Sequence, residues 1–578
     1  MRLSEALRIN QQSDLPNARS RKIHLVCGFT PLHLQTFVQA HAKLRFPGDG
    51  VTIATGFFGD VEGNLKRARE QPAEGAIVVL EWSDLDDRLG FRAAAGWSEK
   101  VLNDILQQVE GKLNRLKQLI SELAGRMPLS IVAGTLPLPP LTHLPLAQAS
   151  IFELQLRSDL IGFLTQVAAI QGVRLVNDST LARSSPYSAR HDVKMELHAG
   201  FPYAIAHAAA IAELAVECLF PPVPKKGLIS DLDETLWSGI LGDVGVAGLS
   251  WCLESHSQPH SLYQQLLGSL AESGVLVAIA SKNDAELVRQ AFERSDILLK
   301  QAQVFPVESN WGAKSESVGR ILDAWNIAAD SVVFVDDSPM ELAEVAERHP
   351  GIECLRFPSD DPAGVIELLR QLRGRFGKSE IREEDRLRLQ SLRASAALQE
   401  SQSAEASPDF LSRLNAKITL DYSNAPNDGR AFELVNKTNQ FNLNGRRYSE
   451  TDWQNYFRAP GAFLLTASYE DRFGPLGKIG VLGGRPVTGA VLVDMWVMSC
   501  RAFSRHIEFQ MIERLYKRFG AQCIRFSFLP TDRNGPLQEF FARFFPAGLG
   551  KDQLDLPEMI FEQSRPQLFH QVIESSHE

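Results

Sequence analysis

A short apolar segment that ends in two closely spaced carboxylates constrains this chain most. Residues 226–237 read KGLISDLDETLW, in which Asp231 and Asp233 directly follow the apolar part. Such a run is typical of a buried parallel strand, and open α/β sheets bind ligands at the carboxyl ends of their strands. Side chains two apart in an extended chain point to the same side. The two acids would repel each other without a cation, which indicates a hard metal such as Mg2+, although a solvated acidic turn could have the same sequence.

Two further apolar segments, 275–280 and 331–335, also end in polar residues. The residues that follow them are Ser281, Lys282 and Asn283 in one case, and Asp336 and Asp337 in the other. Between the two segments, Lys314 begins a helical pattern. The chain thus carries, in order, an aspartate nucleophile, a hydroxyl for phosphate, a lysine and an acidic pair for a metal. This ordered set resembles the four motifs of the haloacid dehalogenase (HAD) phosphatase superfamily.

The chemistry of phosphoryl transfer suggests a role for each of these residues. A carboxylate can be the nucleophile where a metal and a lysine offset its repulsion from phosphate. We expect Asp231 to attack phosphorus, and Asp233 to protonate the leaving oxygen and then to deprotonate the water that hydrolyses the aspartyl phosphate. The predicted Mg2+ ligands are Asp231, the carbonyl of Asp233, Asp336 and Asp337, the last of which could instead hold Lys314. The predicted phosphate-binding residues are Thr235, Ser281, Lys282, Asn283 and Lys314.

Size and charge limit the other possibilities. A chain of 578 residues is too long for one hydrophobic core, so about three or four domains are expected. A net charge of −10 argues against nucleic acid as a main partner, although an acidic carrier protein could bind through a local patch. Six cysteines without a CxxC pair suit a reducing compartment. The N-terminus lacks a signal-peptide pattern, and the most apolar stretch, 203–220, is too polar to span a membrane, so we expect a cytoplasmic protein with no membrane partner.

The first domain, 1–222, alternates strand and helix patterns, which indicates a doubly wound α/β fold. The expected strands are 22–27, 51–54, 75–80 and 129–133, and the expected helices include 32–43 and 98–123. Its position ahead of a HAD domain resembles the SGNH-hydrolase-like domain of longer members of one HAD family. That esterase class uses a strand-end Ser and a later Asp-x-x-His. Here Cys27-Gly28-Phe29-Thr30 occupies the place of the Ser, and no convincing Asp-x-x-His follows, which favours a non-catalytic domain.

The HAD-like domain is expected at 223–375, after a proline-rich hinge, and a charged helical linker at 376–407. The insertion 238–248 is short and rich in glycine. A short insertion predicts a small cap that leaves the active site open. The substrate should then be large or carried by a protein, unless neighbouring domains cover the site.

The last domain, 408–578, contains a dense polar cluster between residues 434 and 448. Its candidate substrate-binding residues are Asn436, Asn439, Asn442, Arg446 and Arg447. The alternative is a loop held by local hydrogen bonds between side chains and backbone. Strand patterns follow at 462–469 and 491–499, and Cys500 lies at the junction with a helix that starts near Ser504. Such a junction can lower a thiol pKa, although a buried inert cysteine would fit the same pattern.

The motifs together resemble the FkbH-like proteins, HAD subfamily IIIC. They are DLDETLWSG at 231–239, SKND at 281–284, NWGAKSE at 310–316, VFVDDSP at 333–339, NKTNQFNL at 436–443 with RRY at 446–448, and SCR at 499–501. The resemblance spans roughly 225–530. It implies a multidomain α/β protein with an SGNH-like N-terminal domain, a HAD-like Rossmannoid domain and a GNAT-like α+β C-terminal domain, although no clear glycine-rich pyrophosphate loop is present.

The resemblance also implies a function. FkbH-like enzymes take the glyceryl group of 1,3-bisphosphoglycerate, remove its phosphate and load it as a thioester onto the phosphopantetheine arm of an acyl carrier protein, for polyketide or related biosynthesis. Many members have Asn where this chain has Glu234, and Cys where it has Ala280. Cys500 is therefore the remaining candidate for a catalytic thiol.

Three other functions remain open. A phosphatase that acts on another metabolite or a phosphoprotein would need no carrier protein. A non-catalytic assembly protein would not need Asp231. An N-acyltransferase would bind acetyl-CoA in the last domain and would not need Mg2+.

Overall fold

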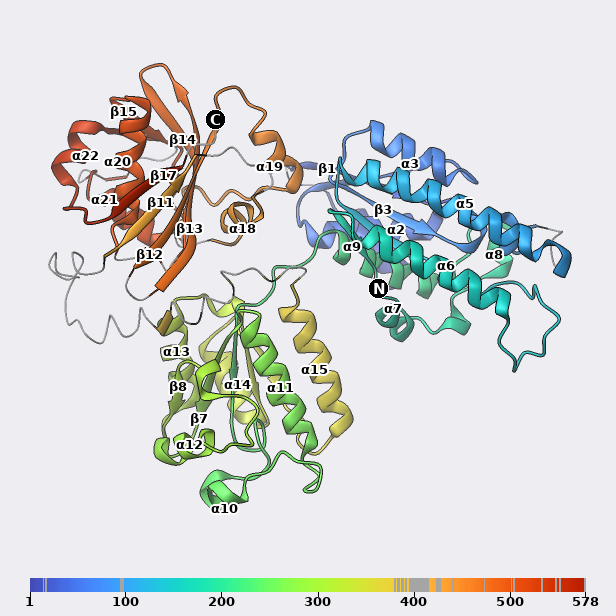
Figure 1. The fold of residues 1–578 in the computed structure, drawn as a ribbon, viewed down its shortest axis with the longest axis horizontal. Coiled ribbons are helices and arrows are strands. Elements are labelled where there is room, and N and C mark those ends of the chain that lie inside the picture. Colours follow the sequence, from blue (N-terminus) through green and yellow to red (C-terminus); the bar gives the residue numbers. More distant parts are fainter. Residues whose placement is uncertain are drawn as a thin grey trace. The chain divides into compact units, whose positions relative to one another are not determined.

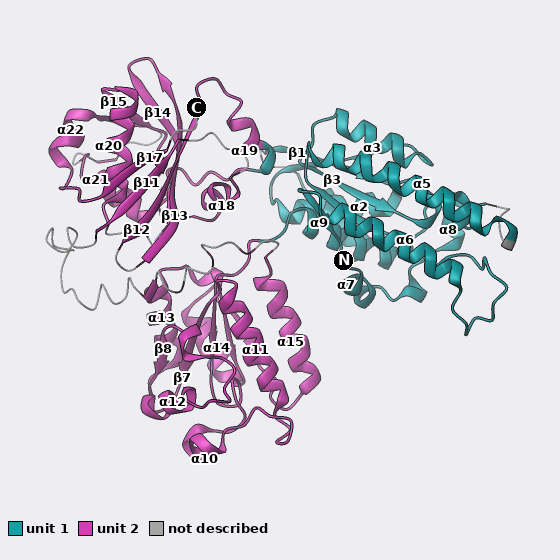
Figure 2. Cartoon of the chain, viewed as in Figure 1, with its two compact units in different colours: residues 1–222, 449–451 teal, residues 223–448, 452–578 magenta. Residues whose placement is uncertain are grey.

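The computed structural model describes most of the chain. The residues outside the description are 14, 16, 17, 94–97, 379, 380, 382–384, 386–388, 390, 391, 394–414, 423–427, 439, 440, 472, 473, 500, 501, 503, 504, 532, 533, 546, 547, 550–552 and 576–578. The chain forms two compact units (Figure 2): Met1–Pro222 with Ser449–Thr451, and Val223–Tyr448 with Asp452–Glu578. The protein is thus a multidomain mixed α/β protein, with three sheets within these units.

The first unit contains a parallel sheet of order β2-β1-β3-β4-β5 (Figure 1). Its strands are β1 (Ser20–Val26), β2 (Gly50–Thr55), β3 (Gly75–Leu80), β4 (Leu129–Ala133) and β5 (Val173–Leu175). Its helices are α1 (Leu3–Asn10), α2 (Leu32–Arg45), α3 (Val61–Glu70), α4 (Trp82–Leu85), α5 (Glu99–Ala124), α6 (Ile151–Ala168), α7 (Asp178–Ser184), α8 (Val193–Ala199) and α9 (Ile205–Leu219). Because α1, α2 and α9 cover one face and α3, α5 and α6 the other, the apolar strands are buried on both sides.

The second sheet is also parallel, with the order β10-β9-β6-β7-β8. Its strands are β6 (Gly227–Ser230), β7 (Leu276–Ser281), β8 (Val307–Ser309), β9 (Val332–Asp336) and β10 (Glu353–Arg356). Its helices are α10 (Leu241–Gly248), α11 (Gln258–Glu272), α12 (Ala285–Phe292), α13 (Lys314–Trp325), α14 (Pro339–Arg348) and α15 (Pro362–Phe376). Apolar clusters with α11, α12 and α15 on one face and with α13 and α14 on the other bury the central strand β6.

The third sheet is mixed, with the order β16-β15-β14-β13-β12-β11-β17. Its strands are β11 (Lys417–Asp421), β12 (Phe463–Asp471), β13 (Gly474–Val487), β14 (Ala490–Met498), β15 (Cys523–Phe526), β16 (Leu554–Pro557) and β17 (Gln571–Ser575). Its helices are α18 (Gly429–Lys437), α19 (Glu450–Tyr456), α20 (Ile507–Phe519), α21 (Gly535–Ala542) and α22 (Glu558–Ser564). The sequence patterns did not reveal β13, whose glycines and Pro486 resemble a loop.

No helix in the described part of the chain combines the length and the apolar character that a membrane span requires. The most apolar long helix, α9, packs against the first sheet instead.

Candidate active site

Asp231 lies at the carboxyl end of the central strand of the second sheet. Its strand, β6, pairs with β7 on one side and β9 on the other, and the Asp231 amide donates to the carbonyl of Val335. The residue is 4% exposed. This position brings together residues from three neighbouring strand ends, because parallel strands end at the same edge of a sheet.

Lys314 connects the carboxylates of two of these strand ends. Its Nζ lies 2.9 Å from Asp231 Oδ1 and 2.6 Å from Asp336 Oδ2. Lys314 is the first residue of α13, and only 6% of it is exposed. The two carboxylates raise the pKa of the lysine against the opposing effect of burial, so that the ammonium form is retained.

A third carboxylate completes an acidic cluster. Asp231, Asp336 and Asp337 each place one side-chain oxygen within 4.8 Å of the others. Burial is the largest effect that raises the pKa of each of these three carboxyl groups. Repulsion between their negative charges raises the pKa values further. Three hard oxygen donors at this spacing suit Mg2+, which would favour the ionised form of each group. The cluster thus unites the side chains that the sequence suggested as metal ligands, apart from Asp233.

The Asp233 carboxylate is held outside this cluster by three N–H donors. Trp237 Nε1 and the Leu241 amide donate to its Oδ1 at 2.9 and 3.2 Å, and Asn283 Nδ2 donates to its Oδ2 at 3.0 Å. Asn283 also donates to Ser281 Oγ at 3.1 Å. Through Asn283, this arrangement joins the Asp233 carboxyl group to the predicted phosphate-binding hydroxyl of Ser281.

The remaining predicted phosphate-binding residues differ in their surroundings. Thr235 is buried, and its Oγ1 has no hydrogen-bond partner in the described part of the chain. Ser281 is the last residue of β7 and is 3% exposed. Lys282 instead forms an ion pair with Glu341 at 2.8 Å. Thr235 and Ser281 are thus both buried, whereas Lys282 has a carboxylate partner on α14.

Glu234 directly follows Asp233 in the sequence and adopts an uncommon backbone conformation. Its φ is 51°, in the left-handed region that Asn and Gly occupy more readily than Glu. Its Oε1 accepts a hydrogen bond from the Gly239 amide at 2.7 Å, which closes the turn after β6. The insertion that follows is not a simple loop, since α10 occupies most of it with a break at Gly245.

In the part of the second unit that contains the third sheet, here called the third domain, most of the polar cluster between residues 434 and 448 stabilises a loop. Asn436 exchanges hydrogen bonds with the backbone of Tyr448, at 2.8 and 3.0 Å. Asn442 accepts from the amides of residues 444 and 445, and Arg447 donates to the carbonyl of residue 435 at 2.7 Å. Arg446 lies over the Tyr448 ring, 4.7 Å from its centroid. The loop interpretation accounts for these contacts, while Asn439 and Cys500 lie outside the described residues.

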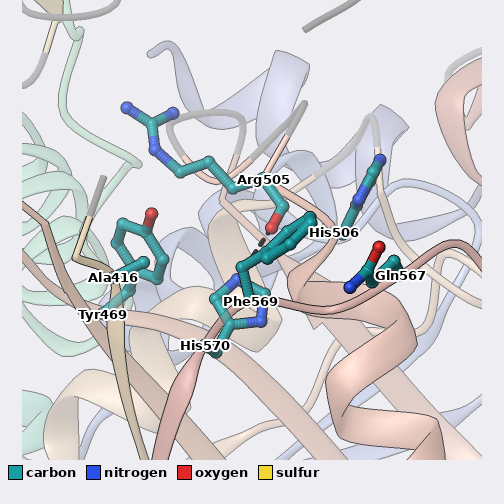
Figure 3. Close-up of a pocket in the computed structure, with 7 residues that line it drawn as sticks. All are labelled: Ala416, Tyr469, Arg505, His506, Gln567, Phe569 and His570. Atoms are coloured by element: carbon teal, nitrogen blue, oxygen red, sulfur yellow. Dashed lines mark hydrogen bonds between the residues drawn. The ribbon is translucent and has the colours of Figure 1, made fainter. Parts of the chain in front are cut away.

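A small pocket in the third domain lies near the start of α20 (Figure 3). It is lined by Ala416, Tyr469, Arg505, His506, Gln567, Phe569 and His570. His570 Nε2 donates to the Arg505 carbonyl at 2.9 Å, so the neutral ring presents Nδ1 as an acceptor. Burial, together with the nearby His506, lowers the pKa of His570 to about 4, against the opposing effect of the hydrogen bond to the Arg505 carbonyl. The buried Arg505 pairs with Asp471 at 3.3 Å.

The first domain contains a buried polar network that the sequence did not reveal. Glu81, directly after β3, accepts from Tyr203 at 2.8 Å and also from Thr135. Thr135 Oγ1 lies 3.0 Å from His207 Nε2, and His207 is fully buried. Cys27 is 4% exposed, and burial raises the pKa of its thiol. This thiol and this imidazole are therefore both buried.

Comparison with known proteins finds a solved structure with a similar fold but does not assign the chain to a family. No family model and no curated protein matches the chain. The N-terminal part of a Bacteroides fragilis protein that contains a phosphatase domain, solved in complex with Mg, matches with a TM-score of 0.52 and 20% identity over 66% of this chain and 100% of that chain. An uncharacterized Corynebacterium glutamicum protein matches with a TM-score of 0.19 and 19% identity, over 27% and 98%. A fungal glucosamine N-acetyltransferase region matches with a TM-score of 0.16 and 9% identity, over 89% and 61%. The chain thus shares its fold with a protein that contains a phosphatase domain.

Proposed function

We propose that the chain is a Mg2+-dependent phosphatase of the HAD type. The observation that carries this proposal is Lys314, which lies between Asp231 and Asp336 beside a third carboxylate, Asp337. Mg2+, held by these three aspartates and the Asp233 carbonyl, would neutralise charge on the phosphoryl group. The fold similarity to a phosphatase-domain protein solved with Mg supports the same reaction class.

The side chains would act in two steps. In the first, an Asp231 oxygen forms a bond to phosphorus, the bond from phosphorus to the leaving oxygen breaks, and Asp233 gives that oxygen its proton. In the second, Asp233 takes a proton from water, the water oxygen forms a bond to phosphorus, and the bond from phosphorus to Asp231 breaks, which releases inorganic phosphate and restores the Asp231 carboxylate. Lys314 offsets the negative charge of the nucleophile and the phosphoryl group in both steps.

We further propose an FkbH-like activity, in which the substrate is 1,3-bisphosphoglycerate and the product is a glyceryl thioester on an acyl carrier protein. Hydrolysis of the phosphate ester would take place at Asp231. The Cys500 thiolate would attack the acyl phosphate carbonyl, expel phosphate and pass the glyceryl group to the phosphopantetheine thiol. The order of the motifs supports this assignment, as does the place of Cys500 after β14. In the same proposal the first domain is SGNH-like and the third is GNAT-like.

Exposed apolar residues near the site favour a substrate presented by a protein. Ile240 precedes Leu241, whose amide holds Asp233, while Trp311 precedes the start of α13 and Met340 belongs to the first turn of α14. These three side chains are 49%, 74% and 70% exposed. A carrier protein could bury exposed apolar side chains such as these, whereas a small polar metabolite would not need them. Trp311→Ala should then raise KM for a carrier-borne substrate and leave KM for a small aryl phosphate unchanged.

The test is intact-protein mass spectrometry of a phosphopantetheinylated carrier protein incubated with the chain, Mg2+ and enzymatically generated 1,3-bisphosphoglycerate, with phosphate release followed in parallel. The wild type should add a glyceryl group to the carrier, and Cys500→Ala should lose this adduct but keep phosphatase activity. Asp231→Asn should lower phosphate release by at least about 10³-fold.

The outcomes separate the candidate functions. Phosphate release without an adduct on any carrier would favour a phosphatase with another substrate. An Asp231→Asn variant with full activity would overturn both proposals.

A further inference from the structure

Helix α6 exposes an uncharged stripe on the face opposite the hydrophobic core. The residues of this stripe are Ile151, Leu154, Ser158, Ile161, Thr165 and Ala168, and all six are exposed. The exposed fractions of Ile151, Leu154 and Ile161 are 84%, 57% and 63%. The core-facing residues of α6 are Phe152, Leu156, Leu160, Phe163 and Val167. The stripe residues are separated alternately by three and four positions, which is the spacing of the contact residues in paired helices. Helix α6 therefore has a second apolar face besides the one that packs on the core.

We propose that α6 pairs in an antiparallel manner with α6 of a second copy of this chain. A twofold axis at the middle of the stripe sets Ile151 against Ala168 of the second copy. The same axis sets Leu154 against Thr165 and Ser158 against Ile161. Each layer therefore joins one large and one small side chain, which is the condition for close interdigitation. The stripe is complementary to itself, as an interface with twofold symmetry requires.

The residues that flank the stripe are compatible with this pairing. Positions 155 and 162 on one side are Gln and Gly, and Arg157 and Leu164 lie on the other. Arg157 is the one charged residue among these four flanking positions. The twofold axis sets it opposite Leu164 of the second copy, so the two Arg157 side chains do not face each other. No like charges meet across the seam, so the pairing should depend little on salt.

The size of the stripe sets the expected strength. A helix of 18 residues is about 27 Å long and about 10 Å wide, which gives on the order of 300 Å2 per copy. Stable dimers bury roughly 1,200 Å2 or more in total, so α6 alone falls short. Two further exposed leucines, Leu144 and the fully exposed Leu146, lie in the segment just before α6. We therefore expect a reversible dimer with a Kd on the order of 10 µM. In Figure 1, α6 lies beside α5 within the first unit.

Sedimentation velocity of the full chain between about 1 and 100 µM tests the pairing. The wild type should shift from monomer to dimer over this range, and Ile161→Asp, in the central layer, should raise Kd by about 100-fold or more. Met559→Asp is the matched control, because Met559 is equally exposed but lies on α22. A wild type that stays monomeric throughout, or an Ile161→Asp variant that dimerises like the wild type, overturns the proposal.

Cross-linking tests the orientation. With Cys252→Ser as background to remove the one exposed cysteine among the described thiols, Leu154→Cys combined with Thr165→Cys should form intermolecular disulfides under oxidised glutathione. Each single variant should not, since an antiparallel seam sets residue 154 against residue 165. Efficient cross-linking of either single variant would overturn the antiparallel arrangement. A monomer whose α6 amides resist hydrogen exchange would show that another part of the same chain covers the stripe.

Discussion

Asn283 Nδ2 lies 3.0 Å from Asp233 Oδ2, and this contact joins the end of β7 to the turn after β6. Trp237 and the Leu241 amide hold the other carboxylate oxygen. The proposed acid–base group is therefore oriented by donors on both of its oxygens. Since proton transfer depends on geometry, Asn283 would act as a positioning residue.

Asn283→Ala should impair reactions that need a proton on the leaving group. We expect kcat/KM to fall by about 10- to 100-fold for an alkyl phosphate, which requires a general acid. For p-nitrophenyl phosphate, whose leaving group is stable as an anion, the fall should be under about 3-fold. Steady-state kinetics with both substrates measures the difference. Equal losses for the two substrates would assign Asn283 to phosphate binding instead.

Lys314→Met should destabilise the second domain, because it leaves the buried Asp231 and Asp336 without their cation. We expect a loss of about 3–5 kcal/mol in the free energy of unfolding without Mg2+, and partial recovery when Mg2+ is added. Urea unfolding with and without MgCl2 measures this. Lys282→Met is the control, since the more exposed pair with Glu341 should contribute about 1 kcal/mol or less. Equal effects of the two variants would contradict the bridging role of Lys314.

Removal of a clustered carboxylate should weaken Mg2+ binding. We expect Asp336→Asn to raise the Mg2+ Kd by about 100-fold and Asp337→Asn by about 10-fold, because Asp336 is fully buried while Asp337 is partly exposed. Isothermal titration calorimetry gives both values. Asp243→Asn, which changes an exposed carboxylate of α10 outside the cluster, should bind Mg2+ like the wild type. The same Kd for all three variants would place the metal elsewhere.

His570 should make the third domain less stable in acid. Burial lowers its folded-state pKa to about 4, whereas the unfolded chain titrates near 6.5. Between these values the unfolded state binds more protons, so the free energy of unfolding falls as pH falls from 6.5 to 4, by up to about 3 kcal/mol. Hydrogen-exchange rates of the β11 and β17 amides at pH 7 and pH 4.5, in the wild type and in His570→Gln, measure this change in the free energy of unfolding. A variant with the same acid sensitivity as the wild type would exclude His570 as the cause.

Local sequence patterns determined where several strands lie in the chain and which polar residues follow each of them. Strands β1, β3, β4, β6, β7 and β9 all contain apolar runs that were visible in the sequence, because burial on both faces of a parallel sheet selects such runs. Lys314 likewise begins a helix where the pattern predicted one. Strand β13 was missed since its glycines remove the periodicity, although pairing with β12 and β14 compensates for this in the sheet.

The tertiary structure alone decided which of these residues meet. The order β10-β9-β6-β7-β8 brings Asp336 and Asn283 to either side of Asp231, and helix α13 inserts Lys314 between two carboxylates. It also turned the Asp233 side chain towards Trp237 and away from the acidic cluster, and it committed Asn436 and Asn442 to loop contacts. The physical reason is that strand ends follow from local burial patterns, whereas contacts between distant residues depend on strand order and helix packing, which no local pattern specifies.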